Sequence, residues 1–408
     1  MNRPWRARSR TLSSLAVLRH RGYAIFVSGN FLSLTGTWMQ RMALAWLIWE
    51  MTESTFWLGL LSAADLLPAT IFTLLGGAAA DRVDRSRLII ACYTLAAGVA
   101  ATFAILQGAG LLLPVPLLAL TFAQGSVQSL GHPARLAILQ GLVPPEEAAN
   151  AVSIGSTTVN LARLFGPALG GILIFHLDVV WVFLVCAALQ ASVVFSLLAV
   201  RTPHVPRSRS SSSIFSEIRD GVVAIFRMSG VRYVLFYLLA SGALLRCMTE
   251  IIPAFAARSF EITSVGLSIL ASTMAIGAVL GALTAASGPD TSLLVRRIMA
   301  NWMAAALVVC VFAFATAPWA AIGCMFVLGL CMVRGMILTQ TYVQLSVPDS
   351  IRGRALSVFS ICSRGSPLIG ALAVGIAADL IGLTVPVLLS GVIIFIAALA
   401  GWLQTKPR

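Results

Sequence analysis

Charged side chains occur inside stretches of this chain that are otherwise almost entirely apolar. In the segment YVLFYLLASGALLRCMTEIIPAFA, Arg246 and Glu250 stand four residues apart with no other charge around them. Five arginines occupy such positions against two acids, Asp65 and Glu250; the arginines are Arg41, Arg163, Arg246, Arg334 and Arg364. Because guanidinium groups offer paired donors to oxyanions, this excess of positive charge favours binding of a carboxylate, catecholate, hydroxamate or phosphate group.

Two of these arginines have an acid within reach. Arg41 and Asp65 lie at similar depths, roughly 12–14 Å below the ends of two consecutive apolar stretches at about 1.5 Å per residue, so we predict that they form an ion pair. Arg246 and Glu250 are spaced i,i+4, which allows direct pairing on one helical face. The alternative for any single arginine is a structural role, in which it bonds backbone carbonyls or extends to the membrane surface.

Uncharged polar side chains accompany the charges. Gln124, Gln128 and His132 recur every four residues and therefore share one face of a helix. They would supply hydrogen bonds either to a polar ligand or to a neighbouring helix, and imidazole titrates near neutral pH. The candidate substrate-binding residues are Arg41, Gln124, Gln128, Asn160, Arg163, Arg246, Arg334 and Arg364, and the candidate proton-coupling groups or counter-ions are Asp65, Glu250 and His132.

Composition indicates the elements that must position these groups. Hydrophobic residues make up 59% of the 408 residues and charged residues 11%, and the mean hydropathy is +0.93. Repeated apolar runs of about 20 residues are typical of transmembrane helices. We predict an all-α polytopic membrane protein with twelve spans, over 23–49, 56–80, 88–108, 115–141, 148–174, 179–200, 232–255, 264–287, 293–315, 319–343, 354–377 and 383–403.

The distribution of positive charge predicts the orientation. Arginines cluster in every second segment between the spans, and the alternate segments carry few of them. By the positive-inside rule both termini are cytoplasmic, which requires an even number of spans. The net charge of +13 therefore reflects topology, and we expect no nucleic-acid partner. The seven cysteines lie in apolar segments without paired spacing, so we expect neither disulfides nor a metal site.

The sequence divides into two halves. Residues 201–231 form a Pro/Ser/Arg-rich linker whose part 214–228 predicts an amphipathic helix on the inner leaflet, between halves 1–200 and 232–408. LVPPEEAANAVS and SVPDSIRGRALS share a Val-Pro pair at an offset of 204 residues. At this offset Gly166 and Gly171 also match Gly370 and Gly375, and Gly77 matches Gly281. Such repeats predict two pseudo-symmetric six-helix halves around a central cavity.

Two motifs resemble those of the major facilitator superfamily. In GGAAADRVDRSRL, the residues Gly77, Asp81, Arg82 and Arg85 are similar to the superfamily's signature loop between the second and third spans. In GPALGG, the residues Gly166, Pro167, Gly170 and Gly171 resemble the core of its antiporter motif. The alternatives are an ordinary positive-inside turn and a seam of small residues for helix packing. With DRVDR and GHPARLAILQGLVPPEEAANA, the resemblance points to the branch of siderophore exporters and macrolide efflux pumps.

The resemblance and the arginines together imply a secondary transporter. We expect it to export a small amphipathic, anionic, siderophore-like molecule by alternating access, coupled to protons, as a monomer in the bacterial inner membrane. Drug or macrolide efflux, lysophospholipid flipping, and a sensor or scaffold that keeps the fold without transport are the alternatives. A P-loop ATPase site requires a lysine within the motif G-x-x-x-x-G-K-[ST]. The single lysine, Lys406 near the C-terminus, does not stand in such a motif, so this site is excluded. We find no nucleophile motif and no zinc-ligand spacing, so we expect neither enzymatic activity nor a cofactor.

Overall fold

The computed structural model describes residues 16–200, 228–254, 256, 264–285, 291–315, 317–348 and 351–405. These residues form twelve α-helices and no strand, which confirms the predicted all-α fold. The first six are α2 (Arg21–Thr52), α3 (Thr55–Arg82), α4 (Arg85–Gly108), α5 (Pro114–Gly141), α6 (Ala148–His176) and α7 (Val179–Leu198). The others are α9 (Ser229–Leu244), α11 (Ser264–Leu283), α12 (Thr291–Ala313), α13 (Pro318–Ser346), α14 (Arg352–Ile381) and α15 (Thr384–Gln404).

The seventh predicted span differs most from its prediction. Instead of one helix over 232–255, α9 ends at Leu244 and the 3₁₀ helix η3 (Arg246–Thr249) follows it. Pro253 lies just beyond, and a proline cannot donate the backbone hydrogen bond that a continuous helix would need. The predicted linker and its amphipathic segment lie outside the described residues, except for the last few positions from Met228 onward.

Ten of the helices in the described residues are long and apolar enough to cross a membrane. The remaining two are α2 and α5, which carry the polar residues Gln40 and Arg41, and Gln124 and Gln128. Both have the length of a span, with 32 and 28 residues, so their lower hydropathy reflects polar positions within the bundle. The two helices outside this set of ten are thus ones that bring polar groups to the interior.

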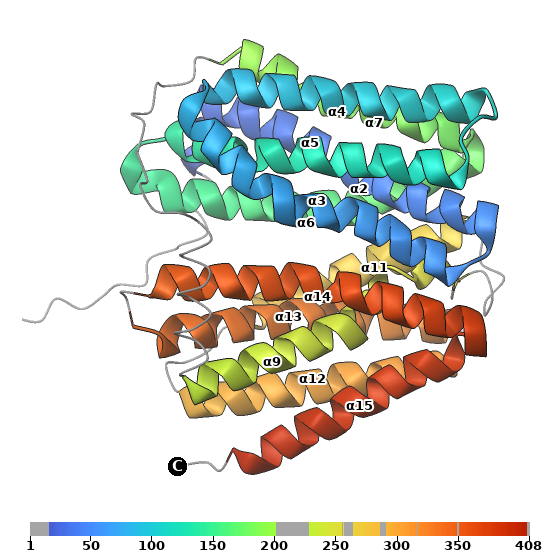
Figure 1. The fold of residues 1–408 in the computed structure, drawn as a ribbon. Helices are drawn as coiled ribbons and strands as arrows, with labels where there is room; N and C mark the ends of the chain where they lie inside the picture. Colours follow the sequence, from blue (N-terminus) through green and yellow to red (C-terminus); the bar gives the residue numbers. More distant parts are fainter. Residues whose placement is uncertain are drawn as a thin grey trace, which may run out of the picture.

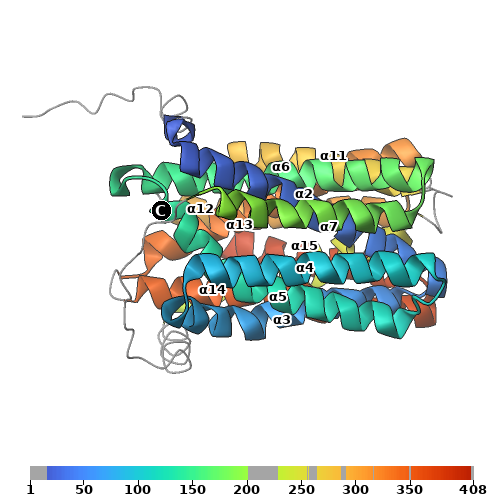
Figure 2. The ribbon, with the colours of Figure 1, turned by 90° about the horizontal axis from the view of Figure 1, so that it is seen from above.

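The helices form two bundles that lie one above the other in Figure 1, α2–α7 and α9–α15. All run along one axis, and the start of the described chain and its C-terminal end lie at the same end of the molecule (Figure 2). The bundles meet mainly through α3 with α14 and α6 with α11. An even number of antiparallel helices places both ends of the chain on one side, as the arginine distribution predicts.

Glycines at repeat-related positions make equivalent contacts in the two bundles. A Cβ atom on Gly166 of α6 would lie 2.6 Å from the Cβ of Trp38 on α2. A Cβ atom on Gly370 of α14, its counterpart in the repeat, would lie 1.7 Å from the Ala243 carbonyl oxygen on α9. In each half the fifth helix therefore packs against the first through a glycine, which is what pseudo-symmetric halves require.

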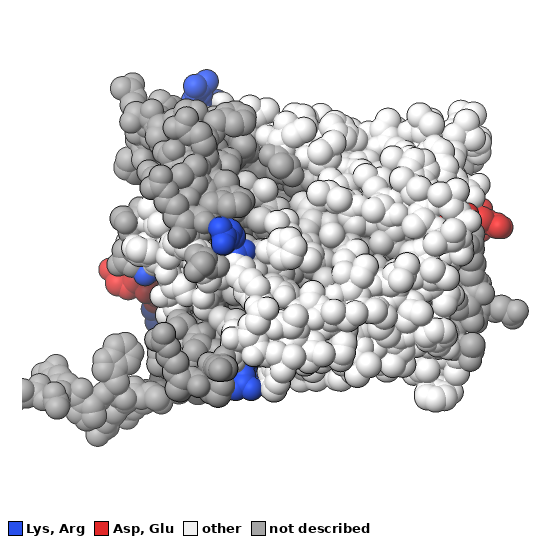
Figure 3. All heavy atoms as spheres, turned by 60° about the horizontal axis from the view of Figure 1, so that its bottom comes forward, with Lys and Arg blue, Asp and Glu red and all other residues white. Residues whose placement is uncertain are grey.

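On the face shown in Figure 3, the described arginines gather at one end, acidic side chains lie at both ends, and the broad middle is uncharged. Large apolar side chains such as Phe195, Ile396 and Leu283 are more than half exposed along the helices. Such a belt is expected where the surrounding solvent is lipid.

Candidate functional site

A cavity of about 40 Å³ lies among α2, α3, α5 and the residue that follows η3. Its polar lining includes Gln40, Arg41, Asp65, Gln124, Gln128 and Glu250. This volume has room for a few water molecules, since about 10–15 Å³ suffices for each. An organic substrate would have to widen it.

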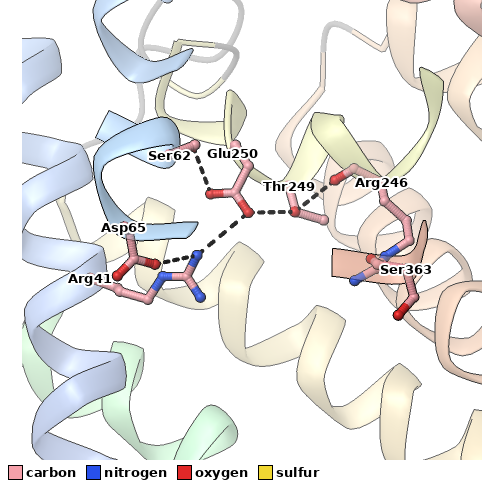
Figure 4. Close-up of polar contacts among 7 residues, drawn as sticks. All are labelled: Arg41, Ser62, Asp65, Arg246, Thr249, Glu250 and Ser363. Carbon is pink, nitrogen blue, oxygen red and sulfur yellow. Dashed lines mark hydrogen bonds and ion pairs between the residues drawn. The ribbon is translucent and has the colours of Figure 1, made fainter. Parts of the chain in front are cut away.

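Arg41 is the centre of an ionic cluster on one wall of the cavity (Figure 4). Its Nη2 atom lies 3.0 Å from Asp65 Oδ2 and 3.7 Å from Glu250 Oε1. The predicted Arg41–Asp65 ion pair is therefore confirmed. Glu250 also accepts a hydrogen bond of 3.0 Å from the Ser62 hydroxyl. Since Arg41 and Ser62 belong to the first bundle and Glu250 to the second, this cluster connects the two halves.

The predicted Arg246–Glu250 pair is wrong. The two side chains point in different directions in Figure 4 because η3 is a 3₁₀ helix, whose three residues per turn remove the i,i+4 alignment. Arg246 instead donates a hydrogen bond of 2.7 Å from Nη1 to the Ser363 carbonyl on α14. The alternative of a carbonyl-bonding arginine, raised above for any single position, holds for Arg246.

Arg163 and Arg41 share an aromatic neighbour. Their guanidinium carbons lie 4.6 Å and 5.1 Å from the ring centroid of Trp38, within the range of cation–π attraction. Arg163 therefore shares the Trp38 ring with the arginine that holds the two carboxylates. The buried Nε atom of Arg163 has no hydrogen-bond partner among the described residues.

The predicted amides on α5 are placed differently from one another. Gln124 is buried and donates a hydrogen bond of 2.8 Å to Gln190 of α7, while Gln128 donates a longer hydrogen bond of 3.4 Å to Thr37. Gln190 in turn donates 3.0 Å to Gln40. The sequence prediction missed Gln40 and Gln190, although an isolated glutamine in the apolar helix α7 is a signal that could have found the second.

The other predicted site residues do not line this cavity. His132, Asn160, Arg163 and Arg334 are half-buried and outside its lining. The Nε atom of Arg334, like that of Arg163, is buried without a partner among the described residues. Arg364 lies on α14, and its side chain is outside the described part of the structure.

The two motif segments occupy helix contacts and a helix start. A Cβ atom on Gly77 would meet nothing within 4 Å, whereas one on the neighbouring Gly76 would lie 2.3 Å from the Leu130 carbonyl oxygen. Asp84 caps α4 by accepting a bond of 2.9 Å from the Arg87 amide. At this motif Arg82 is exposed and Arg85 begins α4, and the Asp81 side chain is outside the described part.

The small residues of the second motif pack closely against α2. Gly166 and Gly170 lie against α2, where added Cβ atoms would come within 2.6 Å of Trp38 and 3.0 Å of Met39. Pro167 and Gly171 are buried in the same helix. The motif thus presses α6 onto the segment of α2 that carries Trp38 and Arg41.

A second polar connection between the halves lies where α3 begins. The Asp379 carboxylate on α14 accepts hydrogen bonds from the Thr55 and Phe56 amides at 2.9 Å and 3.2 Å, and from the hydroxyls of Ser54 and Thr55. Ser54, the N-cap residue of α3, makes no capping bond of its own. Asp379 therefore caps α3 from the other half.

Comparisons with known proteins agree with this architecture. The sequence profile of the transmembrane secretion effector family matches residues 12–408. The chain is 22% identical to the staphyloferrin A transporter of Staphylococcus aureus (88% of this chain, 90% of that protein) and 26% identical to the enterobactin exporter EntS of Salmonella choleraesuis (89% and 87%). A mutant of the nucleoside transporter NupG superposes with a TM-score of 0.78 at 14% identity, over 94% of this chain and all of that chain.

The family match and the fold together identify a transporter of the major facilitator type, built from two six-helix halves. The chain belongs to the transmembrane secretion effector family. The family and these relatives are transporters, which agrees with the expectation that the chain is not an enzyme.

Proposed function

We propose that this protein exports a small amphipathic anion of the siderophore class from the cytoplasm by alternating access, with protons as the coupling ion. The observation that carries the proposal is the pairing of Arg41 and Arg163 at the Trp38 ring, where Arg41 holds the carboxylates of Asp65 and Glu250. Arg163 makes no ion pair within the described residues, so its positive charge is left to meet an anion. A buried positive charge is costly and is expected to serve an anionic ligand.

Arg163 is the best-placed ligand for the anion. Arg41 already has two carboxylate partners and Arg246 has a carbonyl partner. Arg163 is held by the Trp38 ring and has an unbonded Nε, so part of its donor fork is free to meet an oxyanion. The names of the two relatives, a staphyloferrin A transporter and an enterobactin exporter, support a siderophore-like substrate.

The contacts between the halves support alternating access. Asp379 joins α14 to the start of α3, and Glu250 joins the second half to Ser62. Both connections must break if the cavity is to open toward the end where α3 begins. On the orientation given by the arginines, this end is periplasmic, both termini are cytoplasmic, and the halves 1–200 and 232–408 move about the linker 201–231.

Asp65 and Glu250 are the proposed proton-coupling groups. Each loses its attraction to Arg41 on protonation, and for Glu250 that attraction spans the two halves. Proton binding therefore weakens a contact that keeps the halves together. We propose that the protein acts as a monomer, with the bilayer and a small molecule as its partners.

The proposal is tested by transport into inside-out vesicles. We expect uptake of radiolabelled iron-free enterobactin or staphyloferrin A, faster with an imposed pH gradient. Arg163→Gln should lower the rate at least about tenfold, as expected when a charged hydrogen bond is lost. Arg296→Gln is the matched control, because Arg296 also stacks on an indole, Trp402, at 4.5 Å but far along the chain from the cluster. No gradient-dependent uptake of any anion would refute the proposal.

Efflux of neutral or cationic drugs is a second candidate, favoured by one observation. Arg41 is neutralised by two carboxylates that could also hold a cation. This function predicts movement of cationic dyes in the same vesicles, reduced by Asp65→Asn and insensitive to Arg163→Gln.

A further inference from the structure

Three glutamines from three helices form a chain of hydrogen bonds beside the cavity. Gln124 of α5 donates to Gln190 of α7, and Gln190 donates to Gln40 of α2, at 2.8 Å and 3.0 Å. Gln190 is fully buried, whereas Gln40 and Gln124 are 3% and 6% exposed and both line the cavity. The chain thus has a buried middle and two ends at the wall of the proposed site.

Each end of the chain keeps one unused polar atom. The Gln40 amide nitrogen and the Gln124 amide oxygen are buried and have no hydrogen-bond partner among the described residues. Buried polar groups are almost always hydrogen-bonded, so a pair of such atoms on one cavity wall requires an explanation. Entry of a substrate would widen the small cavity between α2 and α5 and uncover both atoms.

The middle residue fixes what the ends can offer. The oxygen of Gln190 faces Gln124 and its nitrogen faces Gln40. Two arrangements keep both bonds: the present one, and the one in which all three amides are reversed together. In either arrangement one end presents a donor and the other an acceptor. An oxyanion would satisfy the donor and repel the acceptor, and an ammonium group would do the opposite.

We propose that Gln40 and Gln124, positioned by Gln190, form a neutral subsite for an uncharged amide or hydroxamic acid group of the substrate. Such a group offers an acceptor oxygen and an N–H or O–H donor, which match the two ends. The inference rests on the proposed function and extends it: the substrate carries an anionic group for the arginines and an uncharged amide-type group for the glutamines. Trp38, which holds Arg163, lies two residues before Gln40, so the two groups lie beside one segment of α2.

Two probes separate this subsite from the anion site. Both are tricarballylic acids with one free carboxylate; the other two arms are benzylamides in the first and benzyl esters in the second. The ester keeps the acceptor oxygen and lacks the donor. Binding of the tritiated probes is measured by scintillation proximity with the purified full chain in nanodiscs, so the result does not depend on transport.

We expect the wild-type chain to bind the diamide at least about tenfold more tightly than the diester. The diester has no donor for the acceptor end of the glutamine chain, and leaving this buried acceptor without a partner weakens binding. This ratio should fall to about twofold or less when the acceptor end is removed, which Gln124→Met does in the present arrangement and Gln40→Met does in the reversed one. Gln190→Met should also lower the ratio and change diester affinity less than about twofold, which a general loss of structure would not do. Gln140→Met is the matched control, because Gln140 is an exposed glutamine on the same helix.

Equal binding of the two probes by the wild type, or a ratio unchanged in both Gln124→Met and Gln40→Met, would overturn the subsite and leave the anion exporter standing. If neither probe binds, the anionic substrate class and the subsite both fail. If Gln190→Met does not fold, the comparison of Gln124→Met and Gln40→Met with Gln140→Met decides the matter alone.

Discussion

Removing the Asp379 carboxylate should shift the protein toward the state that is open where α3 begins. In Asp379→Ala, the Thr55 and Phe56 amides lose a cap that comes from the other half of the molecule. Loss of a helix N-cap costs about 1 kcal/mol, and the exposure of Asp379 argues against a larger value. Since the cap joins the halves, this free energy is lost from the closed arrangement, and the open population should rise about fivefold.

The shift can be measured by alkylation of a cysteine in the cavity. Leu61 lines the cavity on α3 and is 8% exposed, so Leu61→Cys should react slowly while this end is closed. The seven native cysteines are first replaced, and a membrane-impermeant maleimide is applied to intact cells. The rate of alkylation at position 61 should rise about fivefold in Asp379→Ala and less in Asp379→Asn, which keeps one acceptor oxygen.

Asp178→Ala is the matched control for this experiment. Asp178 caps α7 by accepting a hydrogen bond of 3.0 Å from the Val180 amide, so it is an aspartate cap within one half. Its loss should destabilise α7 without changing the balance between the halves. An unchanged rate in Asp379→Ala, or an equal increase in Asp178→Ala, would refute the reasoning.

Further predictions concern packing and the ionic cluster. Gly166→Ala should lower the thermal unfolding temperature because its Cβ would lie 2.6 Å from Trp38, whereas Gly98→Ala, with nothing within 4 Å, should raise it by removing a helical glycine worth up to about 1 kcal/mol. Arg41→Gln should lower the free energy of unfolding by about 3 kcal/mol, since it leaves the Asp65 carboxylate without its cation. Adding Asp65→Asn should recover part of that loss, and no recovery in thermal unfolding of the double variant would contradict the pairing.

Much of the fold could be predicted from the sequence because each span is set by local hydropathy. The Arg41–Asp65 pair could be predicted for a related reason: two consecutive helices share one end of the membrane, so counting residues gives depth on both. The glycine repeat could be found because a spacing of 204 residues relates Gly166 to Gly370 wherever the helices lie in space.

The sequence predictions fail where contacts with other helices, and not the local sequence, determine the structure. The Arg246–Glu250 prediction assumed an α-helix, but the chain forms a 3₁₀ turn there, and each side chain bonds a different helix. The glutamine chain was missed because it requires α2, α5 and α7 to meet at one level, which no spacing within a single helix reveals. Asp379 was missed because its partners are backbone amides and hydroxyls 323 to 325 positions away in the sequence.

Two connections between the halves begin on α3, and their placement determines the sign of coupling in the proposed cycle. Thr55 bonds Asp379 and Ser62 bonds Glu250, about 10 Å apart along the helix, so separating α3 from the second half strains both. Protonation of Glu250 weakens its attraction to Arg41, so the outer end opens more readily with a proton bound and releases that proton when it closes. This order admits protons while substrate leaves.

The same logic distinguishes the arginines. An anion held by Arg41 would displace Asp65 and Glu250 and favour their protonation, so anion and proton would move in the same direction. If Arg163 holds the anion, the cluster of Arg41, Asp65 and Glu250 stays intact. Its two carboxylates can then exchange protons in the half of the cycle in which no anion is bound. Export coupled to proton entry therefore requires Arg163, whose Nε is unbonded, as the principal anion ligand, with Arg41 as the partner of the carboxylates.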